Sequence, residues 1–171
     1  MKKQGFTLIE LMVVIVIMGI LAAVAVPKLF GMIAKSKASE IGPAAGEYIK
    51  LQDAYISETG KYIGSWSAIG YTMSESTPAF SYAKTVQGGV TFTNESATLT
   101  SSAQKIWQAT ANVGLNDCTT GSTWTLYVEK DDSGNGISWG AGVKKGAAGA
   151  SKTDMDSECS VLTPQFINFR S

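Results

Sequence analysis

The stretch QGFTLIELMVVIVIMGILAAVAVP, residues 4–27, decides how this chain folds. It is apolar over a length that crosses a bilayer as a helix, because about 20 apolar residues span the hydrocarbon core. One acidic residue, Glu10, lies inside it. A carboxylate within a membrane helix costs on the order of 3 kcal/mol on insertion scales. The sequence therefore requires a partner for the charge of Glu10.

An amphipathic segment follows the apolar one. Apolar residues recur there at spacings of three and four, the period of a helix with one buried face. They are Phe30, Ile33, Ala34, Ala38, Ile41, Ala45, Tyr48, Leu51 and Tyr55. The pattern predicts one helix from Phe6 to about Ser57, which Gly60 is able to end. We expect this helix to bend at Pro27 and near Pro43, since proline removes a helical hydrogen bond.

The rest of the chain is rich in Ser, Thr, Gly and residues that favour strands, so a sheet is expected there. The predicted strands are Gly89–Thr93, Thr98–Ser101, Lys105–Thr110, Thr123–Lys130 and Ile137–Val143, with Val161–Phe169 as a closing strand. The segment DDSGNG, residues 131–136, predicts a hairpin turn. The fold class is therefore α+β: a long N-terminal helix whose amphipathic half packs against an antiparallel sheet.

Composition excludes several kinds of function. The chain has no histidine, which removes Ser-His-Asp and Cys-His catalysis and any zinc site that relies on imidazole. Fourteen basic and fourteen acidic residues balance, so charge predicts no nucleic-acid partner. Two S-x-x-K matches, Ser81–Lys84 and Ser102–Lys105, lack the accompanying motifs of a penicillin-binding fold. We expect no enzyme.

The two cysteines, Cys118 and Cys159, both lie in the C-terminal third. In an anchored domain that faces an oxidising compartment they are expected to pair, with two unrelated buried thiols as the alternative. A bridge would close a loop of about 40 residues and stabilise the fold by roughly 4 kcal/mol. No C-x-x-C pattern is present, so such a bridge would be structural.

No cofactor is expected, with calcium as the one alternative. Asp131, Ser133, Asn135 and Gly136 stand at offsets of a calcium loop, but Gly142 occupies the place of the bidentate glutamate. A hairpin turn is the favoured interpretation, and the acidic DMDSE segment, residues 154–158, is expected to be a solvated loop. The four tryptophans are expected to pack in the body. The NES segment, residues 94–96, fits a glycosylation acceptor.

Residues 5–27 resemble the N-terminal signature of type IV pilins and of the related pseudopilins of type II secretion. The resemblance implies that a prepilin peptidase cleaves between Gly5 and Phe6 and methylates the new amino terminus of Phe6. Glu10 then stands fifth in the mature chain, as in the family. One helical turn from the cationic terminus, it could pair with its own terminus or with that of a neighbour.

The resemblance also implies a division of the chain. Residues 1–5 form a leader that is removed, residues 6–29 form the transmembrane and filament-core helix, and residues 30–171 form the globular pilin domain. In related pili the helix loses regular structure on assembly between the positions of Gly19 and Pro27, which gives both residues a softening role.

The implied function is that of a structural subunit of a type IV pilus, serving adhesion, motility or DNA uptake. Its partners would be identical subunits, the prepilin peptidase, the assembly machinery of the bacterial inner membrane and the membrane itself, before export as an extracellular filament. One alternative is a major pseudopilin in a periplasmic filament, a class that often holds calcium. A more distant one is a secreted soluble domain cleaved after Ala25, which would begin at Val26.

Overall fold

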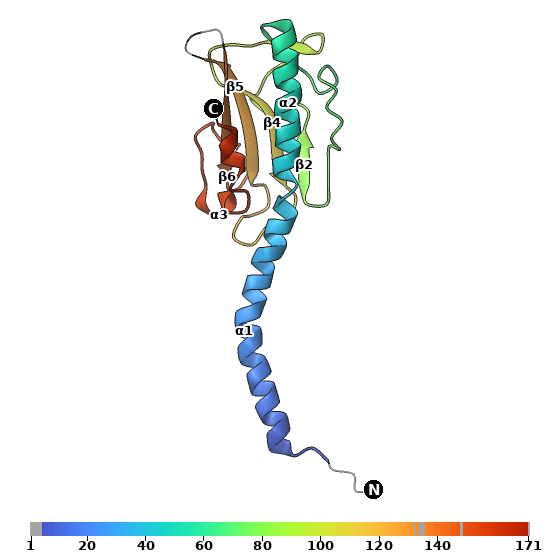
Figure 1. Cartoon of the computed structure of the whole chain (residues 1–171), viewed down its shortest axis with the longest axis vertical. Coiled ribbons are helices and arrows are strands. Elements are labelled where there is room, and N and C mark those ends of the chain that lie inside the picture. Colours follow the sequence, from blue (N-terminus) through green and yellow to red (C-terminus); the bar gives the residue numbers. More distant parts are fainter. Residues whose placement is uncertain (1–4, 132, 134–135, 148, 171) are drawn as a thin grey trace.

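The chain forms a long helical stem that carries a globular body at one end (Figure 1). This computed structural model describes residues 5–131, 133, 136–147 and 149–170. Two helices follow each other along one line, α1 (Leu8–Ala38) and α2 (Ile41–Thr59). We call residues 8–33 the stem and residues 34–170 the body. The predicted α+β arrangement is confirmed.

The helix is divided at Ser39 and Glu40, where a single helix was predicted. Pro43 gives the physical reason, because its ring clashes with the carbonyl four residues earlier, that of Ser39, and it has no N–H to donate there. The same proline is tolerated in the first turn of α2, where the N–H groups have no helical partner anyway. The expected interruption near Pro43 is thus a break between two helices.

The end of α2 agrees with the prediction. Gly60 adopts φ 75°, a left-handed conformation that glycine enters without steric cost, and its N–H donates to the carbonyl of Ile56 at 2.7 Å. By contrast, α1 runs without interruption across Pro27 and curves gently over its length (Figure 1).

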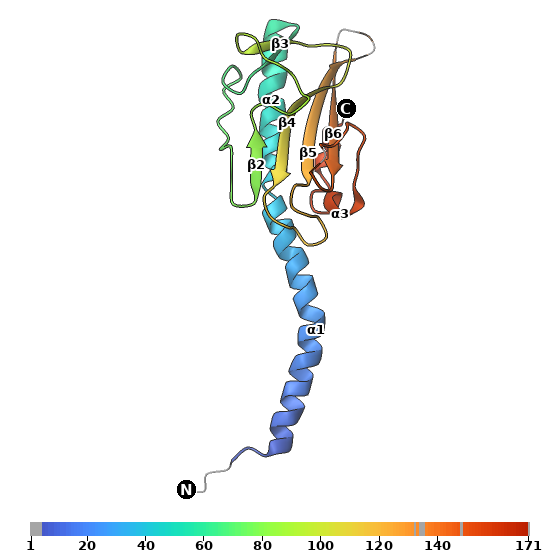
Figure 2. The ribbon, with the colours of Figure 1, turned by 180° about the vertical axis from the view of Figure 1, so that it is seen from behind.

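A four-stranded antiparallel sheet lies behind α2 (Figures 1 and 2). Its spatial order is β2-β4-β5-β6, built from β2 (Phe80–Ala83), β4 (Gln104–Ala111), β5 (Thr123–Lys130) and β6 (Ile137–Lys144). Two short strands, β1 (Tyr62–Gly64) and β3 (Ser96–Thr98), form a separate antiparallel pair. Lys130 is paired with Ile137, so the predicted hairpin between β5 and β6 is confirmed.

Three strand predictions are wrong. Residues 89–93 do not form a strand, because the chain turns at Gly88 (φ 68°) and Gly89 donates back to the carbonyl of Val86. The strand expected at 98–101 is instead β3, at residues 96–98.

Residues 161–169 do not close the sheet either. They lead from the short helix α3 (Ser157–Ser160) into a 3₁₀ helix, η1 (Phe166–Phe169). Leu162, Phe166 and Phe169 recur at a spacing of four and three, which is helical, and η1 packs against α2 and β6.

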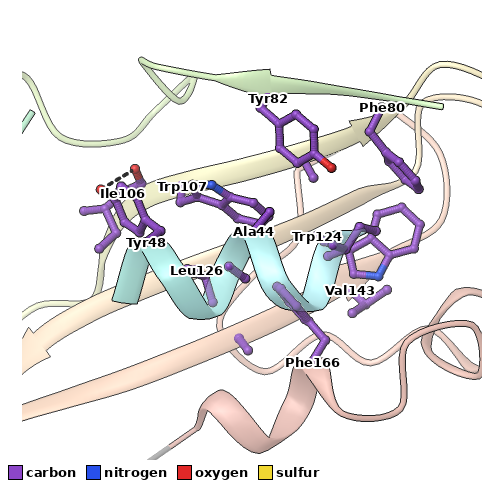
Figure 3. Close-up of a cluster of buried hydrophobic side chains, with 14 of the residues drawn as sticks. Ala44, Tyr48, Phe80, Tyr82, Ile106, Trp107, Trp124, Leu126, Val143 and Phe166 are labelled. Atoms are coloured by element: carbon purple, nitrogen blue, oxygen red, sulfur yellow. Dashed lines mark hydrogen bonds between the residues drawn. The ribbon is translucent and has the colours of Figure 1, made fainter. Parts of the chain in front are cut away.

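The core fills the space between α2 and the sheet (Figure 3). Phe80 and Trp124 meet edge to face with ring centroids 5.4 Å apart, and Trp107 and Phe166 lie 6.3 Å apart. All four tryptophans are buried, which confirms that they serve packing. Aromatic pairs of this kind add to the free energy gained from area burial.

A buried glutamine ties α2 to both sheets. Gln52 is completely buried, and its amide donates to the carbonyl of Gly64 at 2.6 Å and accepts from the Gly64 N–H at 3.1 Å. The same amide donates to the hydroxyl of Tyr48, which in turn donates to the carbonyl of Ile106 at 3.0 Å (Figure 3). A buried polar group of this kind is stable only when its partners are in place.

Chain segments cover part of both edges of the four-stranded sheet. Along β6, the N–H of Val143 donates to the carbonyl of Asp154, and the N–H of Asp156 donates back to Val143, both at 3.0 Å. Along β2, the N–H of Tyr82 donates to the carbonyl of Glu75 at 2.8 Å. Covered edges are protected from pairing with strands of other molecules.

Candidate assembly site on the N-terminal helix

The stem presents its apolar side chains to the outside on every face. All side chains from Gly5 to Phe30 are exposed, and the first buried residue of α1 is Ala34. Phe30 and Ile33, expected on the face that packs against the body, are 58% and 43% exposed. Among the described residues, α1 with its continuation is the one helix long and apolar enough to cross a membrane. The chain itself supplies no cover for this surface.

Glu10 sits in a capping box at the start of α1. Its Oε2 accepts from the backbone N–H of Thr7 at 2.8 Å and from the Thr7 hydroxyl at 2.6 Å. The Glu10 N–H donates back to the Thr7 hydroxyl at 3.4 Å. This arrangement satisfies donors that a helix start leaves free, and a carboxylate there also gains from the helix dipole.

Thr7 was missed as a functional residue. The signal was present, because T-x-x-E immediately before an apolar run is the sequence signature of a capping box. The cap also accounts for the start of α1 at Leu8 rather than at the predicted Phe6.

The predicted cleavage site lies just before the helix. Gly5, Phe6 and Thr7 have no regular secondary structure, and the Phe6 side chain is 88% exposed. A peptide bond outside regular structure is open to a peptidase. Phe6 stands four residues before Glu10, so a terminus created there would lie about one helical turn from the carboxylate.

The two predicted softening residues lie within continuous helix. A Cβ added to Gly19 would meet no atom within 4 Å, so packing within the subunit does not demand glycine there. Pro27 cannot donate to the carbonyl of Ala23, which leaves the ladder of α1 one hydrogen bond short. Both residues lower the cost of unwinding, and their role on assembly stays a prediction.

Cys118 and Cys159 form a disulfide, as predicted. The sulfur atoms are bonded at 2.08 Å, the Cα atoms lie 4.9 Å apart, and both residues are completely buried. The bridge joins the loop between β4 and β5 to α3, at the end of the body nearest the stem (Figure 1).

The calcium interpretation of residues 131–136 stays a prediction. The carboxylate of Asp131 accepts from the Ser133 hydroxyl at 2.8 Å and from the Gly136 N–H at 3.1 Å, which closes the turn. Asn135 lies outside the described residues. Within residues 5–131, 133, 136–147 and 149–170, no group of three or more His, Cys, Asp or Glu side chains is placed to hold a metal.

The first S-x-x-K match does not form a catalytic pair. The Ser81 hydroxyl donates to the side chain of Asn112 at 2.7 Å, while Lys84 forms an ion pair with Glu75. A serine nucleophile requires a base within hydrogen-bonding reach, and the two side chains have separate partners here.

Comparison with known proteins agrees with the geometry of the stem. Residues 1–26 match the model of the prokaryotic N-terminal methylation motif. The chain is 40% identical over 70 residues to the type IV major pilin protein PilA of Myxococcus xanthus, covering 41% of this chain and 32% of PilA. It is 43% identical over 68 residues to the fimbrial protein EcpC of Eikenella corrodens, covering 40% of this chain and 44% of EcpC.

A third relative is the type IV wide pilus major component PilA4 of Thermus thermophilus, 33% identical over 78 residues, with 46% of this chain and 60% of PilA4 covered. The chain thus spans less than two thirds of the length of each of these relatives. No solved structure gives a significant match.

The matched motif coincides with the exposed apolar helix and with the capped glutamate near its start. The chain is thus similar to type IV pilins and fimbrial proteins over less than half of its length, and it carries the methylation motif at residues 1–26.

Proposed function

We propose that this protein is a structural subunit of a type IV pilus, made as a precursor and polymerised through its stem. The observation that carries the proposal is the stem itself, an apolar helix exposed on every face with Glu10 as its only acidic residue. A surface of this size needs lipid before assembly and other stems after it. The relatives, whose names describe major pilins, fimbrial proteins and a major pilus component, favour a pilin over a pseudopilin.

Maturation takes place at Gly5 and Phe6 in this proposal. A prepilin peptidase removes residues 1–5 and methylates Phe6, which leaves residues 6–29 as the membrane anchor and residues 30–171 as the globular domain. The chain stays in the bacterial inner membrane until the assembly machinery incorporates it into an extracellular filament. Gly5→Ser should leave uncut precursor in the membrane, and normal cutting would remove the peptidase from the account.

Glu10 organises assembly by pairing with an amino terminus. Within one subunit its own terminus lies a turn away, and in the filament a neighbour's terminus takes that place. Because lipid tails and a core of packed stems are similarly apolar, hydrophobicity barely separates the two locations. A buried charge pair therefore supplies the axial register that apolar packing alone leaves open.

Two substitutions separate the charge of Glu10 from its capping role. Glu10→Gln keeps the size of the side chain and removes the charge, while Thr7→Ala removes the capping hydroxyl and keeps the charge. We expect both variants to be cut and methylated normally. Glu10→Gln should yield at least tenfold fewer sheared filaments, and Thr7→Ala should yield nearly as many as the wild type.

The outcomes decide the mechanism. Abundant filaments from Glu10→Gln would show that the charge does not organise the polymer. An equal loss in both variants would assign the effect to the helix cap. Glu58→Gln, on the exposed face of α2, serves as the control for removing a glutamate from the same chain.

A further inference from the structure

Three lysines form a collar around the C-terminal third of α1, where the stem meets the body: Lys28, Lys35 and Lys37. All three are exposed, and residues 11–39 contain no acidic residue. In the described part of the chain, none of the three forms an ion pair. The next acid along the chain, Glu40, accepts instead from the hydroxyls of Thr77 at 2.6 Å and Tyr82 at 2.9 Å. The collar therefore carries three positive charges without an ion-pair partner among the described residues.

The collar surrounds the helix. At 100° per residue, Lys28 and Lys35 lie on nearly the same side of α1, whereas Lys37, nine residues after Lys28, lies on the opposite side. A single neighbouring protein would approach from one side. A layer of negative charge that encircles the helix fits this distribution better.

The depth of the collar matches a membrane surface. The helix from Leu8 to Val26 is about 27 Å long, close to the thickness of the hydrocarbon core. Lys28 lies about 3 Å beyond Val26, inside the headgroup layer, and Lys37 about 17 Å beyond it. Helical side chains lean toward the N-terminus, here back toward the membrane, and charges act over a Debye length of about 8 Å. All three lysines are thus placed to attract headgroup phosphates.

Apolar residues within the collar add to this match. Leu29, Phe30, Met32 and Ile33 are 55%, 58%, 62% and 43% exposed, next to the lysines. Lysine beside aromatic and aliphatic side chains is the composition of a segment that lies in the membrane interface. The chain beyond the collar is acidic by contrast: residues 40–171 hold thirteen acidic and nine basic side chains, which leaves four negative charges.

We propose that the collar binds the headgroups of anionic phospholipids and so holds the body against an anionic membrane that would otherwise repel it. This inference rests on the proposed function, since it requires α1 to be in a bilayer. The subunit then loses its lipid contacts when it enters the filament. The collar determines which lipids surround the waiting subunit.

Electron paramagnetic resonance of spin-labelled lipids tests the proposal with the full mature chain in phosphatidylcholine bilayers. Lipid at the protein surface gives a motionally restricted signal, and the ratio for labelled phosphatidylglycerol over labelled phosphatidylcholine measures the preference for an anionic headgroup. We expect the wild-type preference to exceed that of Lys28→Gln/Lys35→Gln/Lys37→Gln by at least twofold. The excess should shrink in 0.5 M NaCl, since salt screens these charges.

Lys50→Gln is the matched control, because Lys50 is exposed on α2 about 20 Å further along the helix than Lys37. It should behave as the wild type. An equal preference in the wild type and the triple variant would overturn the inference and leave the proposed function intact. Absence of any restricted lipid signal would overturn both, because the stem would not be in the bilayer. A triple variant that keeps its lipid preference but loses filaments would overturn the inference and assign the collar to contacts between copies.

Discussion

In the stem every large apolar side chain is exposed, whereas in the body most large apolar side chains are buried against one another. Trp107 and Trp124 are completely buried between α2 and the sheet, while Leu11 and Ile15, equally apolar in kind, are 58% and 62% exposed. The apolar surface of the body is thus mostly buried within the subunit, where its burial stabilises the fold. The apolar surface of the stem is exposed, so its burial can stabilise only contacts with partners outside the subunit.

This difference assigns folding stability and association to different regions of the molecule. Stability resides in the body, where the disulfide, the Gln52 network and the aromatic core act together. We propose that association resides in α1, where Glu10 and the collar add specificity to an apolar surface. A substitution should therefore affect one property with little effect on the other.

Removal of the stem should have the largest effect. A chain that begins at Leu29 keeps Ala34 and Ala38, the buried residues of α1, and loses the apolar span. We expect it to be monomeric and folded in water without detergent, in contrast to the full chain. Analytical ultracentrifugation and circular dichroism measure both properties. An aggregated or unfolded fragment would mean that the body depends on the stem.

Loss of the disulfide should have the next largest effect, confined to the body. Cys118→Ser/Cys159→Ser frees a loop of 41 residues, and the chain-entropy model assigns roughly 4 kcal/mol to its closure. Urea denaturation of the stemless chain, followed by tryptophan fluorescence, measures the loss. Membrane insertion of the full-length variant should be unchanged. A defect in insertion would show that the stem does not act independently of the body.

Gln52→Leu should destabilise the body by about 2 kcal/mol, since it leaves the buried N–H and carbonyl of Gly64 without their partner. Gln165→Leu is the matched control, because Gln165 is exposed beside η1. The same denaturation experiment compares the two variants. Equal stability in both would show that the amide network does not hold α2 to β1.

Alkaline pH should leave stability unchanged up to about pH 10 and lower it only above that value. Burial raises the pKa of Tyr71 to about 12, although the hydrogen bond from Trp107 lowers it. The unfolded chain releases this proton near pH 10 and the folded body retains it, so stability is intact below pH 10 and falls between pH 10 and 12. The fall is at most about 1.4 kcal/mol per pH unit for one tyrosine. In Tyr71→Phe the free energy of unfolding, measured by urea denaturation, should fall less steeply with pH than in the wild type. An identical slope in both would show that Tyr71 does not cause the fall.

The sequence predicted the elements with a strong local signal. Residues 4–27 predicted the stem, the alternation in TWTLYVEK predicted β5 with its observed bounds, and Gly60 predicted the end of α2. Shorter elements escaped because three or four residues carry little periodicity, as in β1 and β2. The strand predicted at residues 161–169 is wrong because the apolar spacing of this segment is helical.

The sequence names residues for the candidate site whose roles stay predictions, and it does not reveal all of the geometry around them. Glu10 stands out because a charge in an apolar run is costly, and Gly5 and Phe6 follow from the resemblance of residues 5–27 to the pilin signature, but the Thr7 cap was missed. The Gln52 network had no local signal, because its partner Gly64 is twelve residues away and acts through its backbone. The tie from Glu40 to Tyr82 depends in the same way on tertiary contact, across 42 residues.

Mass spectrometry of the N-terminal peptide tests the central claim, that the stem is kept whole for association outside the subunit. The peptide is taken from sheared surface material and from membranes of cells that express the protein. The account predicts a chain that begins with N-methylated Phe6, abundant in the sheared material. The same terminus confined to the envelope would favour a pseudopilin. A chain that begins at Val26, without a stem, would contradict the account.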